Sequence, residues 1–209
     1  SGVLSLLHSI EKKNHPFQDI PESYRIKAAA ARKAGTACML KLQVRQGSKL
    51  CIWAGQYDSA TLLPAIGRSY ELASMASWES VAVVKYLMGI ENPSPEIVHA
   101  IESAVQWFKE NKKTGFKIIE VPLTNEQKFD FHKTTFDRKV VTDENAPAIW
   151  ARFYDTGTNE VILANRDGTR VQTYGEIDIE RRTGYQWYGD WPTELIDADY
   201  PEWKKRVNR

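Results

Sequence analysis

The chain has few of the residues that build metal and redox sites. It contains only two cysteines, Cys38 and Cys51, and four scattered histidines. No CxxC motif is present and no two histidines lie three or four residues apart, so a zinc site is not expected. The two cysteines are either a disulfide pair or small buried hydrophobic residues, and the second interpretation is favoured.

Several motifs and charge patterns are also absent. The sequence has no GxxxxGK[ST] or GxGxxG nucleotide loop and no GxSxG nucleophile elbow. No apolar run approaches the ~20 residues that cross a bilayer, so no membrane partner is expected. The net charge is +1, from 28 basic and 27 acidic residues, which argues against a nucleic-acid partner. The apolar start lacks a basic n-region, so it is predicted as an amphipathic helix and not as a signal peptide.

What is present fits one domain over residues 1–209, with no internal boundary. Apolar periodicity predicts helices at residues 3–10, 22–44, 77–89 and 95–114, a short one at 176–182 and a brief C-terminal one that contains Trp203. Strands are predicted at 116–121 and 160–165, and residues 50–53 are either a strand or extended core. Residues 122–143 are polar and mixed and have no clear assignment. The class predicted is mainly α with functional loops.

One charge has no evident structural role. Arg68 follows a glycine in a loop rich in small residues, ahead of the helix predicted to begin near Ser77. A helix start offers unpaired N–H groups and a partial positive charge, and an arginine adds donors that match a carboxylate or phosphate. An anionic ligand is one interpretation. The alternative is an ion pair with Glu71 or Glu79, which the spacing alone favours.

Two further arginines lie among aromatic and glycine neighbours. Arg152 is within WARFY and Arg166 within NRDG. Each alone is typical of a structural ion pair, but the three together suggest recognition of an anionic substrate. The chain also has seven tryptophans and nine tyrosines, and such rings stack on sugars when they line a cleft. No pair of carboxylates stands out for glycoside hydrolysis.

Several runs of sequence together resemble a known family, the polysaccharide lyase family 10 pectate lyases. The runs follow one order over most of residues 2–203, and the main gap is 120–143. They are LKLQVR (40–45), KLCIWAGQYD (49–58), IGRSYEL (66–72), IENPSPEI (90–97), IWARFY (149–154), NRDG (165–168) and ERRTGYQWYGDWP (180–192).

The resemblance implies a fold and an activity. The fold would be mainly α, an (α/α) toroid or incomplete barrel of antiparallel helices with long irregular loops and short β-strands. The chain would be the C-terminal portion of one catalytic domain. The activity would be that of a pectate lyase, which cleaves polygalacturonate (pectate) by calcium-dependent β-elimination. A monomer that is secreted or periplasmic is expected, because the polymer is extracellular.

The resemblance also implies roles for individual residues. Arg68 matches the arginine that removes the proton on C5 of the uronate, next to its carboxylate. Arg152 and Arg166 match arginines that hold substrate carboxylates. Trp78 stands where the family has a small residue, so it either blocks a subsite or stacks on a sugar. Tyr154 is expected to contact substrate. Trp150, Tyr185 and Trp187 are further candidates for the sugar subsites, although core packing is at least as good an interpretation for Trp150.

The implied cofactor is Ca2+, but its ligands are unknown in this chain. The acidic ligands of the family lie upstream of the residue that corresponds to Ser1. Asp58, Glu71, Glu79 and Asp167 are the best substitutes, although each is more typical of an arginine partner or a turn residue. The alternative function is therefore a non-catalytic relative or fragment that binds acidic polysaccharide without cleaving it.

Overall fold

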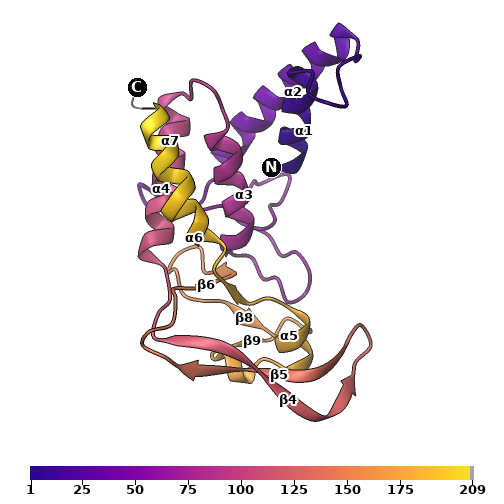
Figure 1. Cartoon of the computed structure of the whole chain (residues 1–209), viewed down its shortest axis with the longest axis vertical. Coiled ribbons are helices and arrows are strands. Elements are labelled where there is room, and N and C mark those ends of the chain that lie inside the picture. The colour runs from indigo at the N-terminus through magenta and orange to yellow at the C-terminus, as the bar shows by residue number, and fades with distance from the viewer. Residues whose placement is uncertain (208–209) are drawn as a thin grey trace.

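A computed structural model describes the chain from residue 1 to residue 207. Helices gather at one end and a long β-hairpin lies at the other, with short strands and loops between them (Figure 1). The helices are α1 (Gly2–Glu11), α2 (Glu22–Lys41), α3 (Ser77–Met88), α4 (Pro95–Glu110), α5 (Ile179–Gly184), α6 (Pro192–Glu194) and α7 (Tyr200–Val207), with a 3-10 turn η1 (Tyr174–Glu176) and a π turn η2 (Leu195–Asp199).

Helix α4 illustrates how local sequence sets these elements. The Ser94 side chain accepts a hydrogen bond from the backbone N–H of Ile97, and Pro95 occupies the first helical position, where its missing N–H costs nothing. One face carries the buried residues Ile97, Ala100, Ile101, Ala104, Val105, Trp107 and Phe108. The predicted helix is confirmed, and it ends about a turn earlier than expected.

The main core joins α3, α4 and α7 to residues 50–53, which run extended and almost fully buried. The Trp53 indole N–H donates to the backbone carbonyl of Met39, 2.7 Å away, and so ties this segment to α2. A second cluster contains Tyr70, Phe153 and Tyr185 and lies between the helices and the hairpin. Of the two interpretations of residues 50–53, a strand is observed only at Leu50, which ends the two-residue strand Lys49–Leu50, and residues 51–53 are extended core.

All sheets in the described residues have two antiparallel strands, in the pairs β1–β2, β3–β7, β4–β5, β6–β10 and β8–β9. The hairpin β4–β5 runs from the Phe116–Thr142 pair to the Lys128–Lys133 pair, with a register shift after Pro122. The strands are β1 (Arg45–Gln46), β2 (Lys49–Leu50), β3 (Met75–Ala76), β4 (Phe116–Lys128), β5 (Lys133–Thr142), β6 (Trp150–Ala151), β7 (Phe153–Tyr154), β8 (Leu163–Ala164), β9 (Arg170–Val171) and β10 (Tyr188–Gly189).

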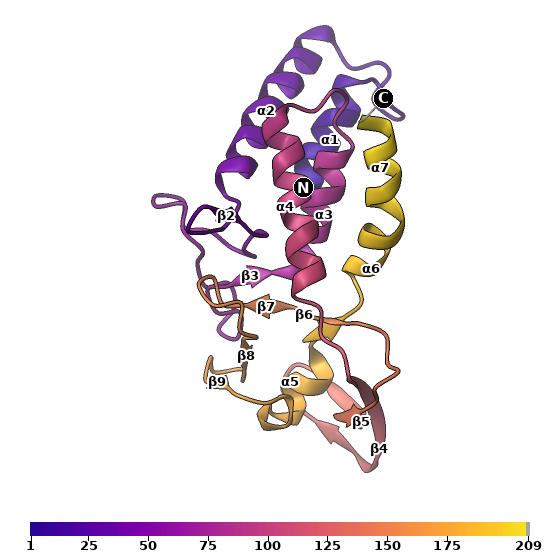
Figure 2. The same ribbon diagram turned by 90° about the vertical axis from the view of Figure 1, so that its left-hand side faces the viewer.

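The expected (α/α) toroid is wrong for this chain. Helices α1, α2, α3, α4 and α7 lie together at one end (Figures 1 and 2), and residues 1–207 do not close into a ring of helices. Residues 111–191 form small sheets, loops and α5 instead. The largest difference is the hairpin, because the unassigned stretch 122–143 holds half of β4 and all of β5.

Two smaller expectations have different outcomes. The thiol of Cys51 is buried as predicted, but Cys38 is exposed on α2, so the prediction that both are buried is wrong there. Both cysteines are free. Within residues 1–207, no helix combines the length and the apolar character that a membrane crossing needs.

Candidate arginine groove

The loop that carries Arg68 folds back on itself as a tight turn. The backbone N–H of Gly67 donates to the carbonyl of Glu71, and the N–H of Glu71 donates to the carbonyl of Arg68. A Cβ at Gly67 would lie 2.8 Å from a Glu71 carboxylate oxygen, so glycine allows that carboxylate to fold over the turn. Glu71 then accepts hydrogen bonds from the Arg68 backbone and side chain and from the Tyr185 hydroxyl.

The three predicted arginines all lie against two tyrosine rings. Tyr70 and Tyr185 pack edge to face with centroids 5.0 Å apart. The Arg68 guanidinium carbon lies 5.0 Å from the Tyr70 centroid and 5.2 Å from the Tyr185 centroid. Arg152 lies 4.6 Å from Tyr185, and Arg166 lies 5.7 Å from Tyr70. We call these five residues the arginine–tyrosine cluster. Arg152 directly precedes β7, Arg166 follows β8 and Tyr185 directly follows α5.

The other two arginines each use only part of the guanidinium for an ion pair. Glu79 accepts from Nε and Nη2 of Arg152, and Glu180 accepts from Nε and Nη2 of Arg166. Within residues 1–207, no hydrogen bond occupies Nη1 of either arginine. Each guanidinium therefore keeps donors for a further carboxylate.

The carboxylates in the cluster have shifted pKa values. Burial raises the pKa of Glu71, but hydrogen bonds from Arg68 and Tyr185 outweigh it and lower the pKa to about 2. Burial likewise raises the pKa of Glu180, and the hydrogen bonds from Arg181 and Arg166 bring it down to about 2. The hydrogen bond to Glu71 raises the pKa of Arg68 above its usual value.

A pH dependence of stability follows from these carboxylates. The pKa of Glu71 in the folded protein, about 2, lies below the 4.5 of an unperturbed glutamate, so the pair stabilises the fold above about pH 5 and this contribution is lost as the pH falls toward 2. Glu71→Gln is expected to lower the melting temperature at pH 7. The difference from wild type should shrink as the pH falls below about 5 and be nearly gone at about pH 2. Thermal melts from pH 7 to pH 2 measure this. A difference that persists unchanged at pH 2 would contradict the linkage.

Two cavities share Arg68 and Arg152 in their walls. One, of about 660 Å³, is also lined by Ile66, Glu71 and Glu79. The other, of about 490 Å³, extends toward α5 and is lined further by Trp78, Arg138, Thr183, Gly184, Tyr185 and Gln186. We call the two together the arginine groove; Arg166 lines neither cavity and lies beside the groove, against Tyr70. Its walls combine guanidinium groups with aromatic faces, which suits an anionic ligand that also has an apolar surface.

The structure places Trp78 in the wall of the groove, 39% exposed. Its ring stacks on Trp191, with centroids 5.1 Å apart and planes 3° from parallel. The Arg152 guanidinium lies 4.5 Å from the centroid of the Trp78 ring. Trp78 therefore contacts Arg152 directly, and Trp191 supports it from a distant part of the chain.

The structure does not bring Tyr154 into the groove. Its side chain is 0% exposed and packs edge to face on Trp107. The Tyr154 hydroxyl accepts from the backbone N–H of Ala151 and donates to the carbonyl of Asn111. Trp187 is also buried, whereas Tyr185 lines the groove. Tyr154 is thus a core residue in this structure.

The described residues do not fit a calcium site. Residues 1–207 contain no group of three or more histidine, cysteine, aspartate or glutamate side chains placed to hold a metal ion. Asp58 and Asp167 accept hydrogen bonds within their own turns, while Glu71 and Glu79 pair with arginines. The four predicted substitutes therefore do not converge on one point.

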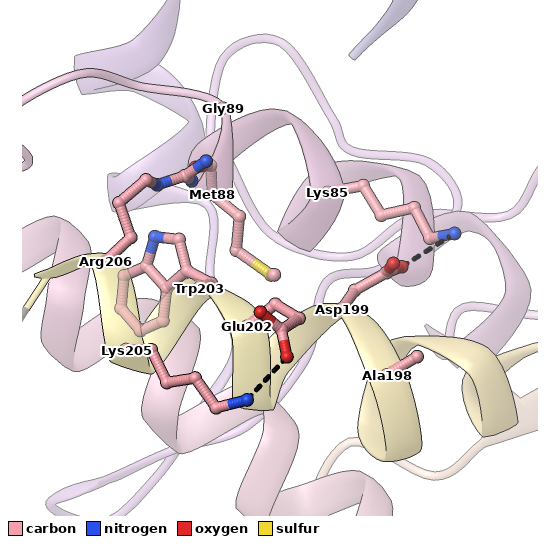
Figure 3. A pocket seen from close by; sticks show the side chains of 9 residues that line it. All are labelled: Lys85, Met88, Gly89, Ala198, Asp199, Glu202, Trp203, Lys205 and Arg206. Carbon is pink, nitrogen blue, oxygen red and sulfur yellow. Dashed lines mark hydrogen bonds and ion pairs between the residues drawn. The ribbon is translucent and has the colours of Figure 1, made fainter.

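Another cavity, of about 700 Å³, lies between α3 and α7 (Figure 3). Its charged rim is internally paired: Lys85 lies 2.9 Å from Asp199, and Lys205 lies 2.6 Å from Glu202. The Arg206 guanidinium donates to a backbone carbonyl, that of Met88. None of the predicted site residues lines this cavity, so the arginine groove is the stronger candidate.

Comparison with known proteins places the chain in a family. The family model described as pectic acid lyase matches residues 1–196. No match is found among curated protein sequences.

Two solved structures of a family 10 polysaccharide lyase from Cellvibrio cellulosa are similar to this chain. One is 26% identical with a TM-score of 0.79, and covers 98% of this chain and 59% of its own. The other, a point mutant in complex with trigalacturonic acid, is 26% identical with a TM-score of 0.78, and covers 99% of this chain. The chain thus spans 60% of the length of that structure. This chain belongs to the pectic acid lyase family.

Proposed function

We propose that the chain binds polygalacturonate in the arginine groove and cleaves it by β-elimination. The observation that carries this proposal is the gathering of Arg68, Arg152 and Arg166 around two tyrosine rings. A polyuronate offers one carboxylate on each sugar, and guanidinium groups match carboxylates in both charge and geometry. A relative of this chain has been solved with trigalacturonic acid, which is a short piece of this polymer. Because this polymer is extracellular, we expect a secreted or periplasmic protein.

In this proposal Arg152 and Arg166 hold uronate carboxylates through their Nη1 groups, since Glu79 and Glu180 occupy the opposite edges. The cleavage step transfers the C5 proton to Arg68, forms a double bond between C4 and C5, and breaks the bond from C4 to the glycosidic oxygen. The leaving oxygen takes up a proton from solvent water and becomes a hydroxyl group. Cations beside the uronate carboxylate stabilise the negative charge that develops on C5 deprotonation.

The pairing of Arg68 with Glu71 sets a condition on this step. A base must be neutral, yet Glu71 raises the pKa of Arg68. Even at the ordinary pKa of an arginine, only a very small fraction of the side chain would be neutral at pH 10. We therefore propose that Arg68 leaves Glu71 when it acts as the base, with an alkaline pH optimum as the consequence. The calcium ion remains a prediction from the family resemblance, because residues 1–207 contain no set of side chains placed to hold it.

The test is ultraviolet absorbance after the protein is mixed with polygalacturonate at alkaline pH, since β-elimination creates an absorbing double bond. Binding is measured in parallel by calorimetry, and fully methyl-esterified polymer, which has no free carboxylates, is the control. Growth of the absorbance band with the acidic polymer alone supports the lyase. A protein that neither binds nor cleaves the acidic polymer contradicts the proposal.

A second candidate is a binder that does not cleave. The ion pair between Arg68 and Glu71 favours it, because this pair keeps the proposed base protonated. Tight binding of polygalacturonate with a flat absorbance trace, in the presence and absence of added calcium, would identify this function.

The stacking of Arg152 on Trp78 gives a prediction about affinity. Trp78→Leu is expected to raise KM for polygalacturonate about three- to tenfold, with kcat nearly unchanged. The reason is that the variant loses the cation–π contact that holds the Arg152 guanidinium in position for the substrate carboxylate. Trp78→Phe keeps a ring and is expected to have a smaller effect. Steady-state kinetics of the two variants measure this. Equal KM values for Trp78→Leu and wild type would contradict the positioning role.

A further inference from the structure

The tip of the β4–β5 hairpin exposes an aromatic ring beside the arginine groove. The turn between Lys128 and Lys133 is closed by a hydrogen bond from the Phe129 N–H to the His132 carbonyl, 2.8 Å long. The Phe131 side chain, at the centre of this turn, is 73% exposed. Single exposed apolar residues are common on proteins, so exposure alone indicates nothing. The surroundings of this ring are what set it apart.

The hairpin tip is held against the groove wall. A ring nitrogen of His132, Nε2, lies 2.9 Å from the hydroxyl of Thr183. A Cβ at Gly184 would lie 3.2 Å from the other ring nitrogen, so the absence of a side chain there lets the imidazole lie close. Thr183 and Gly184 both line the cavity of about 490 Å³. The tip is therefore continuous with the wall of the groove.

Phe131 also adjoins one of the three clustered arginines. The Arg166 guanidinium carbon lies 4.5 Å from the centroid of the Phe131 ring. Glu180 occupies Nε and Nη2 of Arg166, and no hydrogen bond from residues 1–207 occupies Nη1. A partly available guanidinium and an exposed aromatic face thus lie side by side. Besides Glu180, the negative charge of Asp130, which lies next to Phe131 in the turn, also acts on Arg166.

We propose that Phe131 builds an aromatic subsite at the hairpin end of the groove, where its ring stacks on the uronate residue whose carboxylate Arg166 holds. A galacturonate residue has a face of C–H groups that stacks on an aromatic ring and a carboxylate that pairs with a guanidinium. This inference rests on the proposed function and extends it, because it assigns the hairpin the role of holding a longer substrate. The gain in affinity from a short to a long oligomer should therefore be smaller when Phe131 is removed.

The test compares the binding of digalacturonate and hexagalacturonate to the whole chain by calorimetry at fixed ionic strength. Phe131→Ala is expected to weaken hexagalacturonate binding about fivefold, because the variant loses the contact between one face of the ring and one sugar. It is expected to leave digalacturonate binding unchanged. Phe131→Tyr keeps the ring and is expected to bind both oligomers as the wild type does. Tyr24→Ala is the matched control, since Tyr24 is also exposed and carries Lys27 5.6 Å from its ring centroid, but lies on α2.

The outcomes separate the two proposals. If the wild type binds hexagalacturonate and Phe131→Ala binds it equally well, the subsite is refuted and the proposed function stands. If the wild type binds neither oligomer, both are refuted. A loss of affinity in Tyr24→Ala equal to that in Phe131→Ala would also overturn the subsite, because the effect would not be local to the hairpin.

Discussion

Arg68→Ala is expected to lower the rate of unsaturated-product formation from polygalacturonate by about 10²–10⁴-fold, the usual contribution of a general base. The Arg68 side chain is 57% exposed and lies on a surface turn, so the fold should tolerate its removal. Glu71 keeps its hydrogen bond from the Tyr185 hydroxyl in this variant. The measurement is the initial rate of absorbance growth at saturating polymer concentration.

Two further variants separate a base from a general cation. Arg68→Lys retains a charge but loses the planar fork, and it is expected to remain strongly impaired. Arg170→Ala is the matched control, because Arg170 is also partly exposed and its nearest carboxylate, on Glu160, lies 3.6 Å away outside the groove. Near-wild-type turnover in both Arg68 variants would exclude Arg68 as the base.

Glu180→Gln is expected to destabilise the fold by about 3–5 kcal/mol, the range for breaking a buried ion pair on one side. Glu180 accepts hydrogen bonds from both Arg166 and Arg181, and the Arg181 side chain is only 5% exposed. The substitution keeps the side-chain volume but leaves a buried guanidinium without a counter-charge. The Arg181 guanidinium, which lies 4.6 Å from the centroid of the Tyr70 ring, would then be a charge shielded from water with no carboxylate to compensate for the lost hydration.

The free energy of unfolding in urea measures this effect. Glu202→Gln is the control, because Glu202 and its partner Lys205 are both well exposed, and such a pair contributes about 0–1 kcal/mol. A loss of stability in Glu180→Gln no larger than in Glu202→Gln would contradict this prediction, because it would show that the Arg181 guanidinium does not need the charge of Glu180.

Much of the helical end of the molecule could be predicted from local signals. Ser94 and Pro95 mark the start of α4, and its apolar spacing matches the buried face. The hairpin could be predicted only in part, because β4 and β5 are exposed along most of their length. Their sequences therefore lack the regular alternation of apolar and polar residues that marks a half-buried strand. The toroid was inferred from resemblance, and no local signal within the chain tested it.

The residues of the candidate arginine groove could be predicted where a single residue has unusual neighbours in the sequence. They could not be predicted where the groove depends on contacts between residues distant in sequence. Arg68, Arg152 and Arg166 stood out by their aromatic and glycine neighbours, and the alternative of an ion pair between Arg68 and Glu71 is confirmed. The stack of Trp78 on Trp191 joins residues far apart in the chain, so no spacing rule could predict it.

Sequence reasoning also missed Tyr70 and Glu180, which link the arginines. Each is an ordinary residue when taken alone. The one available signal was that both lie within runs that match the family, IGRSYEL and ERRTGYQWYGDWP.

Recognition of uronate carboxylates by Arg152 and Arg166 is tested most directly by a crystal structure of Arg68→Ala with bound trigalacturonic acid, since this variant should slow cleavage in the crystal. We expect uronate carboxylates within hydrogen-bond distance of Nη1 of Arg152 and of Arg166, with sugar rings along the arginine groove. A trimer that binds only in the cavity beside Trp203, or anywhere away from these two arginines, would contradict this expectation.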